Sequence, residues 1–155
     1  MSSSSSNNRN PKVVTLRSSD GIEFIILERV ALMMHMIKLV IQHPIILPPA
    51  VIPLKKIDGK NLAMVIEYCD WHSRPDPVEE HSDSSEPLIL RNMKIKSLHL
   101  KISKIHKLKK LEFELFKNLD IKEMLALVYA ADDLGVSGLS DSVALHLLED
   151  QKFSI

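Results

Sequence analysis

The stretch that decides the fold runs from Asp120 to Asp150 and reads DIKEMLALVYAADDLGVSGLSDSVALHLLED. Asp120 and Glu123 have the spacing of a capping box, in which each side chain accepts a hydrogen bond from the other residue's backbone N–H at a helix start. Gly135 can adopt a positive φ and end this helix, and Ser137 can cap a second one. The stretch therefore predicts two short helices joined by a tight turn. Such helices are not stable alone, so they need a body beneath them or a partner above them.

Each predicted helix has an apolar stripe with the helical period of 3.6 residues. The stripe of the first helix contains Ile121, Met124, Leu125, Val128, Ala131 and Leu134. The stripe of the second contains Leu139, Val143 and Leu147. These stripes are the expected apolar faces of the pair, and the sequence does not divide them between a core and an interface.

Three segments, which follow one another in this order along the chain, each resemble a segment of the same protein family. They are Ser18–Gly21 with Glu23-Phe24, then Pro53-Leu54 with Lys60–Cys69 and His72, and last Tyr129–Val136 with Gly138–Asp141. Together they resemble the Skp-type (S-phase kinase-associated protein) adaptors of SCF ubiquitin ligases. Those adaptors usually carry Leu-Ala-Ala-Asn-Tyr-Leu-Asn-Ile and Asn-Leu-Leu-Asp in the third segment. The resemblance implies an α/β (α+β) domain of the BTB/POZ kind, a small sheet capped by helices with a C-terminal helix pair.

Length and composition agree with one globular domain and exclude several classes. A chain of 155 residues can bury a core, and a formal net charge of zero favours neither nucleic acid nor membrane as a partner. The single cysteine, Cys69, excludes an internal disulfide and fits a reducing compartment. Polar and proline residues interrupt the apolar region Val30–Leu54, which is therefore not a membrane span. The serine-rich segment Met1–Asn10 is expected to be disordered and lacks the apolar core of a signal peptide.

The first third of the chain predicts a hairpin followed by a helix. Strands are expected over Lys12–Leu16 and Glu23–Leu27, joined by a turn at Asp20-Gly21. The segment Glu28–Gln42 is helical by composition. Its expected inner face contains Val30, Met33, Met34, Ile37 and Ile41, while Leu32, Met36 and Leu39 lie on the other side. This second apolar side indicates either deeper burial in a methionine-rich core or an exposed patch for a partner or for self-association.

The middle of the chain alternates connectors with helical segments. The proline-rich segment His43–Pro53 is expected to carry a short, non-central strand near Val51–Leu54. Asp58 can cap the following helix, whose inner face contains Leu62, Val65, Ile66, Cys69 and His72. The segment Ser73–Pro87 is an acidic loop by its composition.

The segment Arg91–Lys110 departs from the family, since it contains eight Lys or Arg residues and no acid. Its apolar residues fit either a helix or a strand, and periodicity does not decide between the two. It is either a solvated, separable insert or a basic patch for a nuclear-import receptor, an acidic partner or an anionic lipid surface. Because the segment has no aromatic residue, single-stranded nucleic acid is the weaker alternative.

The residues show no catalytic or metal-binding constellation, so we expect no enzyme activity, cofactor or metal. Cys69 and His72 lack the second pair of ligands that a zinc site needs, and Cys69 is expected to be an inert core thiol. The histidines do not repeat at ligand spacing, and there is no glycine-rich phosphate loop.

The resemblance also implies a domain organisation and a function. We divide the chain into a disordered tail (1–10), an N-terminal BTB/POZ-like part (11–74), an acidic loop plus basic insert (75–113) and a C-terminal helical part for F-box binding (114–155). We expect an adaptor that links F-box proteins to a cullin scaffold, in nucleus and cytoplasm, with neither nucleic acid nor membrane as a partner. The alternatives are a self-associating BTB-like interaction domain and a degenerate paralogue that has lost cullin and F-box binding.

Two sets of residues carry this expectation. The residues expected to bind the F-box are Leu125, Val128, Leu134, Leu139, Val143 and Leu147. Asp132 and Asp133 are expected to face cullin, where the family has an Asn-Tyr pair, so cullin affinity should be low. The family sequence continues beyond the position of Asp150 with Gly-Lys-Thr-Pro-Glu-Glu-Ile-Arg and further helical residues that wrap the F-box. Without them, F-box binding should be weak.

Overall fold

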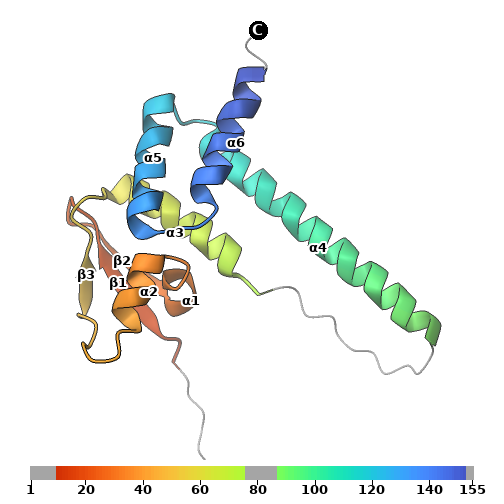
Figure 1. Ribbon diagram of the computed structural model, residues 1–155, viewed down its shortest axis with the longest axis horizontal. Coiled ribbons are helices and arrows are strands. Elements are labelled where there is room, and N and C mark those ends of the chain that lie inside the picture. The colour runs from red at the N-terminus through yellow and green to blue at the C-terminus, as the bar shows by residue number, and fades with distance from the viewer. Residues whose placement is uncertain (1–9, 76–86, 153–155) are drawn as a thin grey trace, which may run out of the picture.

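The computed structural model describes residues 10–75 and 87–152, and within these ranges it leaves the side chains of residues 87–97 and 150–152 undescribed. The described elements are β1 (Val13–Arg17), β2 (Glu23–Leu27), α1 (Glu28–Ala31), α2 (His35–Ile41), β3 (Val51–Pro53), α3 (Gly59–Ser73), α4 (Pro87–Phe116), α5 (Ile121–Leu134) and α6 (Leu139–Lys152). They form a small sheet with helices packed against it, as expected (Figure 1). Residues 1–9 of the expected tail (1–10) and residues 76–86 of the expected acidic loop (73–87) lie outside the described residues.

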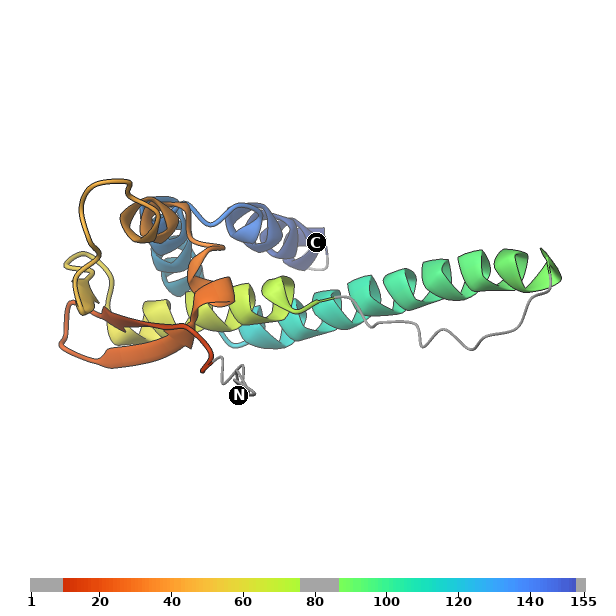
Figure 2. The same ribbon diagram turned by 90° about the horizontal axis from the view of Figure 1, so that it is seen from below.

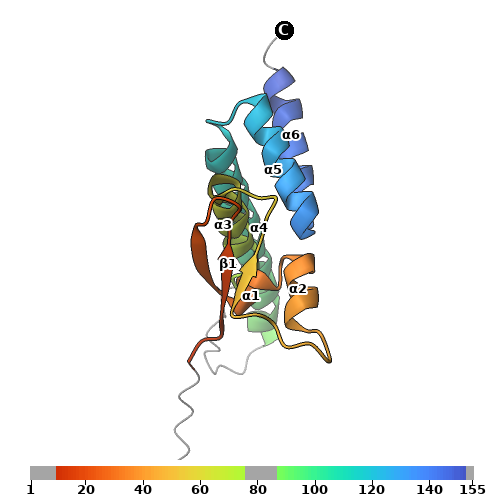
Figure 3. The same ribbon diagram turned by 90° about the vertical axis from the view of Figure 1, so that its left-hand side faces the viewer.

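The sheet has the strand order β2-β1-β3. β1 and β2 pair antiparallel with Arg17 opposite Glu23, and Gly21 in the turn has φ 85°, which confirms the predicted hairpin with β1 shifted by one residue. β3 pairs parallel with β1 at the sheet edge, where its proline does not interrupt a ladder on both sides. Figure 3 shows β1 and β3 beside α2 at this side of the molecule.

The expectation of one helix over Glu28–Gln42 is wrong, because the backbone is broken between α1 and α2. Met34 is extended, with φ −94° and ψ 106°, and forms an isolated antiparallel bridge with Val136 in the turn after α5. The His35 N–H donates to the Gly135 carbonyl at 3.3 Å. A Cβ on Gly135 would lie 2.8 Å from the His35 Cβ, so this close approach requires glycine. A pairing distant in sequence therefore overrides the local helical pattern.

The core extends from the sheet through α3 to the C-terminal helices (Figures 1 and 2). α3 begins as predicted, with the Asp58 side chain accepting from the Asn61 N–H at 2.8 Å. Its fully buried side chains are Leu62, Val65 and Cys69. Because α3 contacts α1, α4 and α5, it joins the two halves of the chain around one core.

The segment whose periodicity was ambiguous is a helix, and α4 extends over 30 residues. Its C-terminal end packs on the body, with Phe116 buried and Leu115 and Leu111 half-buried. The N-terminal part projects away from the other helices (Figure 2). The expected boundary between the basic insert and the C-terminal part lies between residues 113 and 114. α4 runs without a break across this boundary, so its projecting part and its packed part belong to one helix.

Candidate interaction surfaces

The α5–α6 pair is held in place at both ends of α5. The capping box is confirmed: the Asp120 side chain accepts from the Glu123 N–H at 2.7 Å, and the Glu123 carboxylate accepts from the Asp120 N–H at 3.3 Å. Glu123 also forms an ion pair with Lys60 of α3 at 3.0 Å. Gly135 ends the helix with φ 68°, as predicted. The exposed residues of α5 are therefore presented on a helix whose position is well defined.

The second helix starts differently from the prediction. α6 begins at Leu139, so the residue before it is Gly138 with φ 89°, and Ser137 does not occupy the capping position. The Ser142 N–H donates to the Gly138 carbonyl at 2.9 Å, which is the first helical hydrogen bond. Gly138 therefore occupies the position at which the sequence pattern predicts the capping side chain of Ser137.

The structure divides the six residues expected to bind the F-box into two groups. Leu134, Leu139 and Val143 are fully buried core residues, so they present no surface to a partner in this structure. Val128 and Leu147 are half-buried and pack against the core, while Leu125 is 47% exposed. The first three residues support the helix pair, and the last three contribute to its surface.

The predicted stripe of α5 combines two faces of the helix. The side chains that α5 buries are Met124, Leu127, Ala130, Ala131 and Leu134. Ile121 and Leu125 point outward instead, together with Tyr129, which is 69% exposed. Their spacing of four residues places these three on neighbouring turns of one face. Tyr129 is not among the contact residues predicted from the sequence, although its position eight residues after Ile121, with Leu125 halfway between them, indicates this face.

The second expected surface is at the C-terminal end of α5, where the two acidic residues have different surroundings. The Ser140 hydroxyl donates to an Asp132 carboxylate oxygen at 3.3 Å, so Asp132 bonds to the start of α6. Asp133 lines an apolar groove of about 480 Å³. Its other lining residues are Met36, Ile37, Val40, Ile52, Pro53, Leu54, Lys55, Lys56, Ile57 and Leu134. Only Asp133 thus belongs to the surface between α2, β3 and α5.

The outer side of α2 is exposed rather than deeply buried. Met36 and Leu39 are each about half exposed, and Leu32 is half-buried. The connector after α2 adds Ile45, Ile46 and Leu47, which are all exposed. Of the two interpretations of this second apolar side, the structure supports the exposed patch.

The ionisable groups that the structure describes include two side chains of α3 that burial affects, Cys69 and Tyr68. No group of three or more His, Cys, Asp or Glu residues in these ranges is placed to hold a metal ion. Burial raises the pKa of the Cys69 thiol to about 12, so this thiol is unreactive, as expected. Burial also raises the pKa of Tyr68, which packs on the His72 ring with centroids 4.1 Å apart. Among the helices of the described ranges, none combines the length and apolar character that crossing a bilayer requires.

Two comparisons with known proteins agree with the fold and with the sequence motifs. Residues 12–74, from β1 through α3, match the sequence model of the Skp1 family tetramerisation domain. Over 144 residues the chain is 30% identical to SKP1-like protein 19 of Arabidopsis thaliana. This alignment covers 84% of the present chain and 71% of the Arabidopsis protein. Members of this family are adaptors rather than enzymes. The chain therefore belongs to the Skp1 family, the SCF adaptors of the ubiquitin conjugation pathway, and its sheet and helices are the family's BTB/POZ-like fold.

Proposed function

We propose that this chain links F-box proteins to a cullin scaffold as the adaptor subunit of an SCF-type ubiquitin ligase, in nucleus and cytoplasm. The observation that carries this proposal is the arrangement of α5. One face of the helix exposes Ile121, Leu125 and Tyr129, while Asp133 at its end lines the groove beside α2. A rigid helix with a separate surface on each side is suited to hold two partners at a defined distance.

The F-box surface consists of the exposed face of α5 together with the outer side of α6. Leu125, Val128 and Leu147 are the predicted contact residues that retain exposed area, and Leu148 of α6, whose side chain is 59% exposed, adds to them. Exposed apolar side chains on neighbouring helices are a suitable surface for an amphipathic helix. The buried Leu134, Leu139 and Val143 hold this surface in shape.

A charge at Leu125 tests the F-box surface. Leu125→Glu should weaken binding of an F-box peptide at least about tenfold, because a carboxylate would be desolvated at the contact. The matched control is Ile25→Glu, which places the same charge on β2 at a side chain that is 72% exposed. Calorimetric titration of both variants measures the difference, and equal binding by the two variants would contradict this placement.

The cullin surface is the groove lined by Asp133. Two acids at the C-terminal end of α5 oppose the helix dipole, and the last turn of the helix has no basic residue. An unpaired carboxylate is also costly to desolvate at an apolar contact. Asp132→Asn together with Asp133→Tyr should therefore raise both helix stability and affinity for an N-terminal cullin fragment.

The two single variants separate the contributions of the two acids. Asp133→Tyr should account for most of the gain in cullin affinity, because Asp133 lines the groove and Asp132 bonds to Ser140. Asp132→Asn serves as the control and should change cullin affinity little. Tight binding by the unmodified chain, with no gain in the double variant, would show that basic cullin residues pair with these acids.

The exposed side of α2 favours self-association as a second candidate function. Met36 and Leu39 form an apolar patch with Ile45, Ile46 and Leu47, and Met36 also lines the groove beside Asp133. A second copy bound there would compete with cullin for α2. Light scattering during size exclusion should show a concentration-dependent dimer that Leu39→Glu abolishes; a monomer at every concentration would exclude this candidate.

A further inference from the structure

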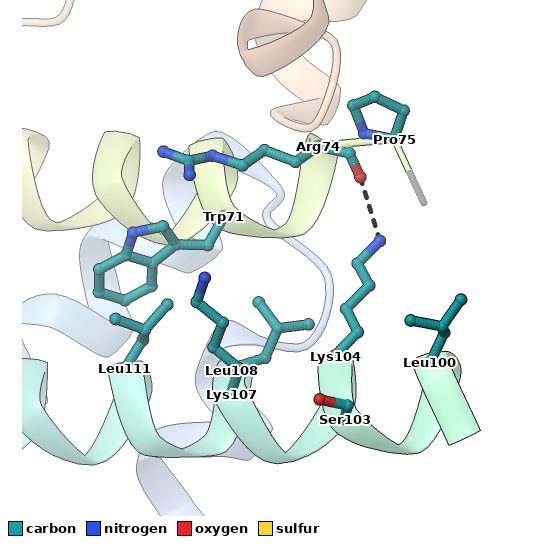
Figure 4. A pocket seen from close by; sticks show the side chains of 9 residues that line it. All are labelled: Trp71, Arg74, Pro75, Leu100, Ser103, Lys104, Lys107, Leu108 and Leu111. Carbon is teal, nitrogen blue, oxygen red and sulfur yellow. Dashed lines mark hydrogen bonds between the residues drawn. The ribbon is translucent and has the colours of Figure 1, made fainter. Parts of the chain in front are cut away.

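A recess between α3 and α4 lies outside both surfaces described above. The end of α3 contributes Trp71, and the chain just after it contributes Arg74 and Pro75. Across from them, α4 contributes residues between Leu100 and Leu111 (Figure 4). The cavity has a volume of about 260 Å³. Its residues belong neither to the exposed face of α5 nor to the groove at Asp133.

The walls of the recess are apolar. The half-buried indole of Trp71 lies on the α3 side, and the half-buried side chains of Leu108 and Leu111 lie opposite (Figure 4). Leu100, at the outer end, is 38% exposed. Small-molecule sites have volumes of about 300–1,000 Å³, so this recess is suited to a single large apolar side chain.

The rim of the recess is basic. Arg74, Lys104 and Lys107 are among its lining residues, and none of the lining residues that the structure describes is acidic. The Lys104 ammonium donates to the Arg74 carbonyl at 3.1 Å and connects the helices, while Asp70 pairs with the Arg74 guanidinium at 2.8 Å. Lys107 rises from α4 toward Trp71 (Figure 4). A ligand with carboxylates beside an apolar group therefore complements this site.

We propose that this recess binds an acidic peptide segment of a partner protein, with one apolar side chain inserted against Trp71 and flanking carboxylates on Lys107 and the adjacent rim. A flat membrane surface would meet the outward Ile102 and Ile105 of α4, which are more than half exposed, rather than a recess between two helices. A single half-buried indole is not the row of aromatics on which single-stranded nucleic acid stacks. The proposal does not depend on F-box or cullin binding.

The position of Trp71 makes the proposal directly measurable. Trp71 is the only tryptophan of the chain, so its fluorescence reports on this recess alone. The probe is a synthetic peptide of aspartate and glutamate residues with one central phenylalanine, titrated into the full chain. We expect a saturable shift of the emission to shorter wavelength, because the phenylalanine excludes water from the indole. The same peptide with serine in place of phenylalanine should give no such shift.

Two pairs of variants separate the recess from the general charge of α4. Lys107→Glu should weaken peptide binding about tenfold or more, whereas Lys101→Glu, the same charge change outside the recess, should have a smaller effect. Leu100→Ser should weaken binding, whereas Leu98→Ser should not, since Leu98 does not line the recess. All four positions carry exposed side chains, so these variants should fold.

Several outcomes would overturn the proposal. No saturable shift at millimolar peptide would show that the recess does not bind such a segment, and equal losses in Lys107→Glu and Lys101→Glu would indicate a diffuse charge effect. Tighter binding to phosphatidylserine vesicles than to the peptide would assign the basic surface to a membrane. Peptide binding only after Asp76, Glu79, Glu80, Asp83 and Glu86 are changed to their amides would identify the chain's own acidic segment as the occupant.

Discussion

α4 and α5 are both rich in aliphatic residues, but they use these residues in opposite ways. α5 buries Met124, Leu127 and Leu134 against neighbouring helices, with two alanines between them. Among the side chains that α4 shows from residue 98 onward, Phe116 is buried and most of the aliphatic ones are exposed. The difference lies in the surroundings, since α5 packs against α2, α3 and α6, whereas α4 meets α3 and α6 over its C-terminal part. Apolar content alone therefore does not decide burial.

The largest effect is expected from a substitution that leaves a cavity beneath α5. Leu127 is fully buried, so Leu127→Ala should lower the free energy of unfolding by about 2–5 kcal/mol. Leu98→Ala in α4 removes the same atoms from an exposed position and should change it by less than about 0.5 kcal/mol. Urea unfolding followed by circular dichroism measures both values. Equal losses would mean that the projecting part of α4 is packed in solution.

The next test concerns the place where α4 joins the body. The His72 imidazole and the Glu112 carboxylate are 2.7 Å apart, and both side chains are mostly buried. Glu112→Ala should cost about 1.5–3 kcal/mol of unfolding free energy, because it removes a charged hydrogen-bond partner and leaves His72 unpaired. The control is Glu114→Ala, whose half-exposed side chain pairs only with Lys117 among the contacts described. A loss no larger than that of the control would show that the contact does not anchor α4.

A smaller, pH-dependent effect is expected at the end of α3 beside the recess. Hydrogen bonds from Arg74 and then Arg29 hold the pKa of Asp70 below its ordinary value of 3.8. The resulting stabilisation is fully present above the unfolded-state pKa and is lost as the pH falls through the lower folded-state pKa. Exposed pairs of this kind contribute about 0.2–1 kcal/mol each. Asp70→Asn should therefore lower stability at neutral pH.

The pH dependence of Asp70→Asn provides the control for that effect. The difference in unfolding free energy between the variant and the unmodified chain should shrink as the pH is lowered from about 5 to about 2. Unfolding by urea at several pH values measures this difference. A difference that stays constant over the whole range would show that the Asp70 charge is not its cause.

The smallest effect is expected from removing the projecting part of α4. Deleting residues 91–102 should change the free energy of unfolding by less than about 0.5 kcal/mol, because the described side chains at its end, from Leu98 to Ile102, are exposed. A longer deletion through Lys110 should cost more, since Lys104 and Leu108 face α3. Thermal unfolding compares the two deletions. If both deletions lower the midpoint equally, residues 91–102 contribute to the stability of the body, and the part of α4 that can be removed without loss is shorter than these residues.

Local patterns in the sequence determined the elements whose ends are set by turn or capping residues. Asp-Gly set the hairpin turn, Asp58 capped α3, and the Asp120–Glu123 box with Gly135 set both ends of α5. In each case the deciding hydrogen bonds or dihedral angles lie within a few residues of one another. The family resemblance, which rests on these same segments, was recognisable for that reason.

The tertiary structure alone decided the features that depend on distant contacts. α5 is apolar on more than one face, so only packing against α3 could show that Leu127 is inside and Leu125 outside. The Met34–Val136 bridge broke a helix that composition favoured. Packing also separated Asp132 from Asp133 and brought Trp71 opposite α4. The surfaces that partners can reach are made by side chains far apart in the chain, and their placement follows from how the helices pack on one another.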